Sequence, residues 1–284
     1  MRKSQRKRQI LLLGLLASFA GTGAAQEAMA ASAPPVFSLN PQTAWVGIGI
    51  GAFLPVPGSP SPVGQDPAHR YISNDVSGVT GQQPTQRISD IGNPNLKQWA
   101  KDIMKKDNDE VLAGKFAFTA RSSCKPGGVP GFDVLLGGAL FILQSPREVT
   151  MIFSGNNEQR HIPLNASHSA NPKPSWYGES VGHYEGDTLV VDTIGLNDKT
   201  FVDNYRTPHT AKLHVTERWR MIEDGKKLEI LLTIDDPDTF SQPFQELRQY
   251  DRVNRILAED ICSENNFNPF GIDYGTPMAE KPDF

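Results

Sequence analysis

A succession of short strand-like segments separated by tight-turn residues limits the fold of this chain more than any other feature. Beyond residue 124, runs rich in β-branched and aromatic residues alternate with joints that carry Gly, Pro, Asn or Asp, the residue types that tight reversals favour. The pattern predicts strands at residues 139–144, 148–154, 158–164, 180–184, 188–195, 212–222, 226–236 and 243–253. Because most links between them are short, successive strands are expected to pair antiparallel.

The clearest reversal lies in WYGESVGHYEGDTLVVDT, residues 176–193. Glu185-Gly186-Asp187 separates two strand segments there, and glycine supplies the positive φ that a tight turn needs. About eight strands in such a meander predict a mainly β domain, a closed or partly open lipocalin-like barrel. A two-sheet β-sandwich is the alternative, because the number of strands does not separate the two architectures.

Composition divides the chain into four parts. Residues 1–30 are expected to be a signal peptide, 31–92 an irregular arm rich in Pro, Gly and Ser, 93–266 a helix plus the β-barrel domain, and 267–284 an irregular tail. Within the arm, WVGIGI (residues 45–50) is an apolar island. It either docks on the domain or adds an edge strand.

One amphipathic helix is predicted before the strands. Asn93-Pro94 is typical of a helix start, with asparagine as N-cap and proline in the first turn, and Gly114 is a natural stop. One face of this helix is expected to be apolar and consists of Leu96, Trp99, Ala100, Ile103 and Met104. The helix is therefore expected to pack against the sheet.

The N-terminal segment has the features of a secretory signal. Five basic residues precede an apolar run at residues 10–17, and Ala28-Met29-Ala30 offers small residues at a cleavage site. A retained membrane anchor is the alternative. Removing residues 1–30 leaves 23 basic and 31 acidic side chains, a net charge of −8, which repels nucleic acid. The mature chain is expected to be periplasmic or secreted, without a stable membrane span.

The chain has two cysteines, Cys124 and Cys262, and no CxxC or Cys/His zinc spacing. In an oxidising compartment an isolated pair most simply forms one disulfide bond. The alternative is two buried thiols. The bridge would close a loop of 138 residues, for which the chain-entropy treatment gives a stabilisation of about 4–5 kcal/mol.

Long motifs fill much of the second half of the chain. They are AGKFAFTARSSCKPGGVPGF (113–132), PSWYGESVGHYEGDTLVVDTIGLNDKTFVDNYRTPHTAKLHVTERW (174–219), TIDDPDTFSQPF (233–244) and CSEN (262–265). They resemble a large family of exported bacterial proteins that share W-x-G-x-S-x-G-x-(W/Y)-E-G-D-T-L-V-V-(D/E)-T, followed by PH and ER motifs. The resemblance covers about residues 93–265 and implies no activity, because the family is uncharacterised. Tyr184 stands where many members carry Trp.

The predicted strand 212–222 places one acid among apolar side chains. The two-residue period gives one face to Leu213, Val215, Glu217, Trp219 and Met221. If this face lines the barrel interior, the Glu217 carboxylate needs a cation, hydrogen-bond donors or a raised pKa. One interpretation is a general acid/base or a ligand-orienting group. The other is a structural ion pair with Arg160 or Arg248.

Two histidines lie in the two long predicted loops, residues 165–179 and 196–211. If both loops cover one end of the barrel, these histidines converge with two carboxylates and suit acid–base chemistry near neutral pH. The predicted catalytic set is His168, His209, Glu217 and Asp198. For either histidine alone, a satisfied loop hydrogen bond is the alternative. The ligand types would suit a metal, but no HxH, HxxxH or HExxH spacing occurs, so none is expected.

Three classes of function fit these features. The first is an exported β-barrel that binds a small, largely apolar or aromatic molecule. The residues expected to line its pocket are Trp176, Trp219, Arg160 and Tyr184. The second is a cofactor-independent acid–base enzyme of the same fold: a lyase, hydratase, isomerase or hydrolase. The third is an envelope structural or interaction protein that uses the arm. The sequence has no nucleotide loop, haem motif or iron–sulfur spacing, so no cofactor is expected.

Overall fold

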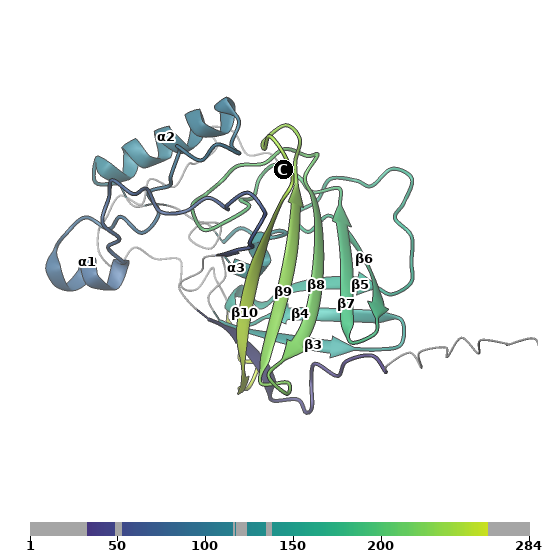
Figure 1. Cartoon of the computed structure of the whole chain (residues 1–284). Helices are drawn as coiled ribbons and strands as arrows, with labels where there is room; N and C mark the ends of the chain where they lie inside the picture. The colour runs from purple at the N-terminus through teal and green to yellow at the C-terminus, as the bar shows by residue number, and fades with distance from the viewer. Residues whose placement is uncertain (1–32, 49–52, 116, 118–123, 135–137, 261–284) are drawn as a thin grey trace, which may run out of the picture. The chain divides into compact units, whose positions relative to one another are not determined.

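Ten strands form one sheet whose end strands, β5 and β6, come together, so that the sheet is nearly closed into a barrel (Figure 1). The computed structural model describes residues 33–48, 53–115, 117, 124–134 and 138–260. The sheet order is β5-β4-β3-β1-β10-β9-β8-β7-β6, and β2 pairs with β10 outside this path. The strands are β1 Thr43–Gly47, β2 Leu54–Pro55, β3 Ala139–Gln144, β4 Glu148–Phe153, β5 Glu158–Pro163, β6 Glu179–Glu185, β7 Thr188–Ile194, β8 His214–Ile222, β9 Lys227–Asp235 and β10 Phe244–Asn254.

Neighbouring strands within the sheet pair antiparallel, as the short links predict. β6–β10 run side by side, and β3–β5 run across their direction (Figure 1). β5 and β6 meet at a single parallel bridge between Leu164 and Gly182, and the Asn165 N–H donates to the Gly182 carbonyl at 2.7 Å. The prediction of a mainly β, nearly closed barrel is therefore confirmed.

The predicted strands agree with the structure to within two residues at either end, because alternation and turn chemistry are local signals. Residues 139–144 coincide with β3, whereas the segment predicted from residue 212 begins at His214. In the central hairpin, Gly186 has φ 62°, the left-handed conformation that the turn requires.

The barrel interior is filled by side chains from both halves of the sheet. One row crosses four strands, from Val191 through Glu217 and Leu232 to Glu246, and all four side chains are buried. The largest fully buried side chains include Trp45, Trp219, Arg160, Tyr250 and Phe132. Since these groups are out of reach of water, the interior around them is a packed core.

β1 comes from the segment expected to be an irregular arm. Its residues pair with β10 along the whole of Thr43–Gly47, and Trp45 and Val46 also pair with β3. Residues 45–47 of the apolar island therefore lie in a central strand of the sheet and not in an edge strand. The same segment supplies β2 and a short helix, α1 (Asn74–Thr80).

The predicted helix exists but begins four residues later than expected. α2 spans Gln98–Leu112 with Lys97 at the N-cap, and Gly114 has φ 93° just beyond its end. Residues 93–97 are held by the loop between β9 and β10: Asn95 exchanges side-chain hydrogen bonds with the Gln242 backbone, and the Lys97 N–H donates to Thr239 at 2.9 Å. These tertiary contacts outweigh the local start signal at Asn93-Pro94.

The buried face of α2 differs at one position from the predicted one. Ala100 and Met104 are buried and Trp99 is partly buried, but Ile103 is exposed. The indole N–H of Trp99 donates to the Asp238 carbonyl at 2.7 Å, so the helix packs on the β9–β10 loop. Two shorter helical segments complete the described elements: α3 (Gly131–Val134) and η2 (Gly155–Asn157).

Several predictions concern residues outside the described part of the chain. These are the signal peptide at residues 1–30, the C-terminal tail at 267–284 and Cys262, so the Cys124–Cys262 disulfide stays a prediction. Among the described helices, none has the length and apolar character that a membrane crossing requires.

Candidate functional site

The Glu217 carboxylate is paired with Arg160 inside the barrel. Arg160 Nη1 donates to Glu217 Oε1 at 2.9 Å, and Arg160 Nη2 donates to Glu217 Oε2, which makes the pair bidentate. The Arg160 and Glu217 side chains are 1% and 0% exposed. The alternation that predicted an interior Glu217 is thus confirmed, and of the two candidate partners Arg160 is the one observed.

Arg160 also reaches two hydroxyl groups on the strands between β5 and β8. Its Nη2 donates to Thr193 Oγ1 at 2.8 Å, and its Nε and Nη2 each lie 3.2 Å from Ser180 Oγ. Ser180 lies on β6 and Thr193 on β7, so one side chain from β5 connects three further strands. Backbone pairing between β5 and β6 is limited to the Leu164–Gly182 bridge. The arginine therefore closes the barrel where the backbone ladder is interrupted.

This arrangement satisfies both oxygens of Glu217. No water-sized space adjoins its side chain, which is fully buried between Val191 and Leu232. An acid or base that exchanges protons with a substrate needs contact with that substrate. The geometry of Glu217 favours the structural ion pair.

His209 is a buried, neutral loop residue. Its Nε2 accepts from the Thr200 hydroxyl at 2.7 Å, and its Nδ1–H donates to the Thr210 carbonyl at 3.0 Å. Burial lowers the pKa of His209. Because both ring nitrogens have partners in one tautomer, the satisfied loop hydrogen bond is the interpretation that the structure favours.

His168 lies on the outer surface of the sheet. Its Nε2 contacts Asp192 Oδ2 at 2.8 Å and its Nδ1 contacts Glu179 Oε1 at 3.2 Å, while His214 Nε2 approaches Asp192 Oδ1 at 2.6 Å. Burial alone would raise the pKa of Asp192, but the two imidazoles hold this pKa below its usual value. These contacts fasten residues 165–179 to β6–β8 from outside.

The four residues of the predicted catalytic set therefore do not meet. Glu217 lies in the interior, His209 within the 196–213 loop and His168 on the outer surface, and the fourth, Asp198, is exposed. The two long loops meet at a parallel bridge between Ser175 and Leu196, but their histidines have different partners and do not share one site. Catalysis by this set stays an untested hypothesis without geometric support.

The residues expected to line an interior pocket are also dispersed. Trp219 is 0% exposed and belongs to the packed core, as does the Arg160 ion pair. Tyr184 is half-buried, and its hydroxyl accepts from Gln144 Nε2 at 2.9 Å. Trp176 is half-buried near Gly128, where an added Cβ would lie 2.8 Å from the Trp176 carbonyl oxygen.

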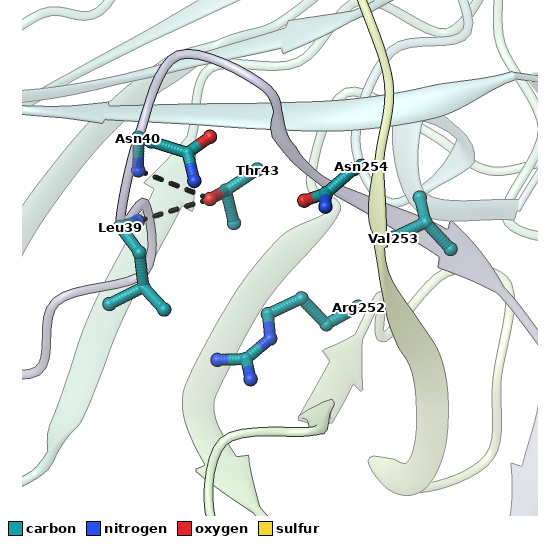
Figure 2. Close-up of a pocket in the computed structure, with 6 residues that line it drawn as sticks. All are labelled: Leu39, Asn40, Thr43, Arg252, Val253 and Asn254. Carbon is teal, nitrogen blue, oxygen red and sulfur yellow. Dashed lines mark hydrogen bonds between the residues drawn. The ribbon is translucent and has the colours of Figure 1, made fainter.

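A hollow lies where β1 begins and β10 ends (Figure 2). Its volume is about 340 Å³, near the lower end of the range for ligand sites. The lining residues are Leu39, Asn40, Thr43, Arg252, Val253 and Asn254. We call it the end hollow. A second, shallower hollow shares Asn254 and adds Gln42, Arg255 and Ile256.

Among the described residues that line the end hollow, Arg252 is the only charged one. The alternation that places Arg248 and Tyr250 inside continues to Arg252 at the end of β10. Within the described part of the chain, its guanidinium has no hydrogen-bond or ion-pair partner. In the nearby β8–β9 turn, Glu223 is paired with Lys227 at 2.7 Å, and no ion pair joins Asp224 to Arg252.

The sequence reasoning missed this hollow because its two walls are far apart in the chain. Residues 39–43 belong to the segment expected to be irregular, and Arg252 falls at the end of the last predicted strand. Their meeting depends on the pairing of Thr43 with Asn254 and of Trp45 with Arg252. The only local signal was the periodicity of β10, which puts Arg252 on the interior-facing side.

Neither a metal site nor a known relative identifies the protein. Among the described residues, no group of three or more His, Cys, Asp or Glu side chains is placed to hold a metal ion. No protein-family model, curated protein or solved structure matches the chain. The family resemblance therefore stays a prediction.

Asp203 is a buried carboxylate in the loop that also holds His209. Its Oδ1 accepts from the Tyr205 N–H at 2.8 Å and the Thr207 N–H at 3.2 Å, and its Oδ2 accepts from the Thr207 hydroxyl at 2.6 Å. Burial nevertheless raises the pKa of Asp203 to about 6, from a usual value near 3.8. The folded state thus holds this proton at a pH where the unfolded state has released it.

We therefore expect Asp203 to make the protein more stable as the pH falls from about 7.5 to 5. The folded-state pKa lies above the unfolded one, so protonation favours folding in this window, by about 1–1.5 kcal/mol at pH 5. The measurement is urea unfolding of the wild type and Asp203→Asn at both pH values. Because His209 is common to both proteins, its opposite effect cancels in the difference. An equal pH response in both would contradict the assignment.

Proposed function

We propose that the protein is an exported β-barrel that binds a small molecule in the end hollow, not in the barrel interior. The observation that carries the proposal is the guanidinium of Arg252, which lines a hollow of ligand size and has no partner among the described residues (Figure 2). Arg252 is half-buried, so a ligand that pairs with its guanidinium replaces part of its contact with water by a charged hydrogen bond.

The packed barrel interior also supports a ligand site in the end hollow. Glu217, Arg160 and Trp219 were expected to surround an interior ligand, but each is 0–1% exposed and the two charges are paired. An interior ligand would have to displace core side chains or break the ion pair. At the end hollow no described side chain has to be displaced.

A ligand screen by thermal shift tests this proposal. The panel should contain anionic, cationic and neutral small metabolites, and at least one is expected to raise the unfolding midpoint. At a concentration of 100 times its Kd, a ligand specific for the folded state adds about 2.7 kcal/mol. Arg252→Gln should abolish the shift.

Arg218→Gln is the matched control. It removes the same charge from β8, where Arg218 is exposed and paired with Glu185, and it should leave the shift intact. The proposal fails when no compound stabilises the protein, and also when the stabilisation survives Arg252→Gln.

Export is the second part of the proposal and rests on the basic and apolar pattern of residues 1–30. Protein recovered from the extracytoplasmic fraction is expected to begin near residue 31. N-terminal sequencing checks this, and a chain that still begins at Met1 would count against cleavage.

A further inference from the structure

We infer that the end hollow selects an amphipathic carboxylate, with the carboxylate on Arg252 and an apolar body over Leu39. This inference rests on the proposed function and names the chemical class of its ligand. It depends on three properties of the lining: which polar groups are already engaged, the sign of the charge, and the position of the aliphatic side chains.

Two polar side chains of the lining, Thr43 and Asn40, already accept backbone hydrogen bonds. Thr43 Oγ1 accepts the N–H groups of Leu39 and Asn40, both at 3.2 Å (Figure 2). A hydroxyl oxygen has two lone pairs, so only the Thr43 O–H remains to bond a ligand. Asn40 Oδ1 accepts the Gln42 N–H at 2.8 Å, and the Asn40 amide NH₂ donates to no described residue. Together with Arg252, the hollow offers donors, and donors bind anions.

The charge of the lining also favours an anionic ligand. The two adjoining hollows contain Arg252 and Arg255, and none of the described residues that line them is acidic. Gly225 of the neighbouring β8–β9 turn lies beside the Arg252 guanidinium, and Asp224, the residue before it, makes no ion pair with Arg252. An anion is therefore attracted to this end of the barrel although the chain as a whole is acidic.

Aliphatic side chains stand at the rim of the same site. Leu39 is 64% exposed in the end hollow and Ile256 is 77% exposed in the adjoining one. An apolar ligand body would remove this surface from water, which is favourable in proportion to the area covered. A purely ionic ligand would leave these side chains exposed.

A carboxylate fits this lining better than a phosphate. Its planar oxygens match one guanidinium through two parallel hydrogen bonds, and its single charge is balanced by Arg252 alone. A phosphate dianion would need a second cation, but Arg252 is the single cation among the described residues that line the end hollow. The expected ligand is thus a monocarboxylate with a short aliphatic or aromatic body.

Isothermal titration at low ionic strength tests the inference with four probes. Octanoate has both features, 1-octanol lacks the charge, acetate lacks the apolar body, and inorganic phosphate carries a different anion. Octanoate is expected to bind saturably, and the other three at least about tenfold more weakly. Arg252→Gln should weaken octanoate at least about tenfold, the usual effect of losing a charged hydrogen-bond partner. Arg218→Gln should leave its affinity unchanged.

The other outcomes distinguish a wrong ligand class from a wrong proposed function. Equal affinity for 1-octanol, acetate or phosphate overturns the ligand class, as does octanoate binding that Arg252→Gln leaves intact. If octanoate does not bind but another metabolite stabilises the protein through Arg252, the class is wrong and the proposed function stands. If no compound depends on Arg252, the proposed function itself fails. Unchanged unfolding midpoints of the ligand-free variants exclude misfolding as the cause.

Discussion

Arg160→Met is expected to lower the free energy of unfolding by about 3–5 kcal/mol, the usual result of removing one partner of a buried ion pair. The substitution leaves the Glu217 carboxylate without its cation in a place that water does not reach. It also removes the hydrogen bonds to Ser180 and Thr193, and with them the side-chain connection from β5 to β6 and β7. Urea unfolding of the wild type and the variant measures the loss.

Two further variants separate the ion pair from general damage to the core. The double variant Arg160→Met/Glu217→Leu removes both charges and should recover most of the stability, because desolvation of the pair offsets much of its attraction. Arg218→Met breaks an exposed pair with Glu185 and should cost less than about 1 kcal/mol. A loss below about 1 kcal/mol for Arg160→Met would show that Glu217 finds other partners or takes up a proton.

Glu217→Gln distinguishes a structural carboxylate from a functional one. It keeps the shape of the side chain but leaves the Arg160 guanidinium uncompensated, so stability should fall. Glu217 lies in the same row of the sheet as Glu246 of β10, whereas Arg252 lies near the end of that strand. Ligand affinity at the end hollow should therefore stay unchanged. A variant with normal stability and lost binding would restore the interior site.

The sequence predicted what depends on neighbours in the chain. Turn residues and two-residue alternation located the strands, and the same alternation placed Glu217 in the interior. The sequence predicted that the ion-pair partner of Glu217 is Arg160 or Arg248. It did not distinguish between them, because the choice depends on how β5 meets β6. That junction has one backbone bridge, and nothing in the local sequence of either strand specifies it.

The sequence did not predict what depends on distant pairing. Residues 43–47 carry an apolar run too short to assign, and they become β1 only because β10 and β3 accept them on either side. The end hollow follows from this pairing, since Thr43 and Asn254 face each other there. The helix start failed for the same reason, because Asn95 is bonded to the β9–β10 loop. Tertiary contacts overrode the local signals in both cases.

Gly178, directly before β6, is the second position where a single substitution should greatly lower stability. Gly178 has φ 63°, and a Cβ there would lie well inside van der Waals contact with the carbonyl oxygen of Ile194. A backbone oxygen of β7 cannot rotate away as a side chain can. Gly178→Ala therefore combines an unfavourable φ with a steric clash, and we expect it to lower the free energy of unfolding by at least about 3 kcal/mol.

Gly81→Ala is the matched control for the backbone contribution. Gly81 ends α1 with φ 70°, and nothing lies within 4 Å of an added Cβ, so alanine should cost only about 1 kcal/mol there. Urea unfolding and the soluble yield of both variants give the comparison. Equal losses would mean that β6 and β7 shift apart to accept the methyl group. A larger loss at Gly178 would show that the glycine of the W-x-G motif serves the close approach of residues 175–178 to β7, which is a structural reason for the motif that requires no catalytic role.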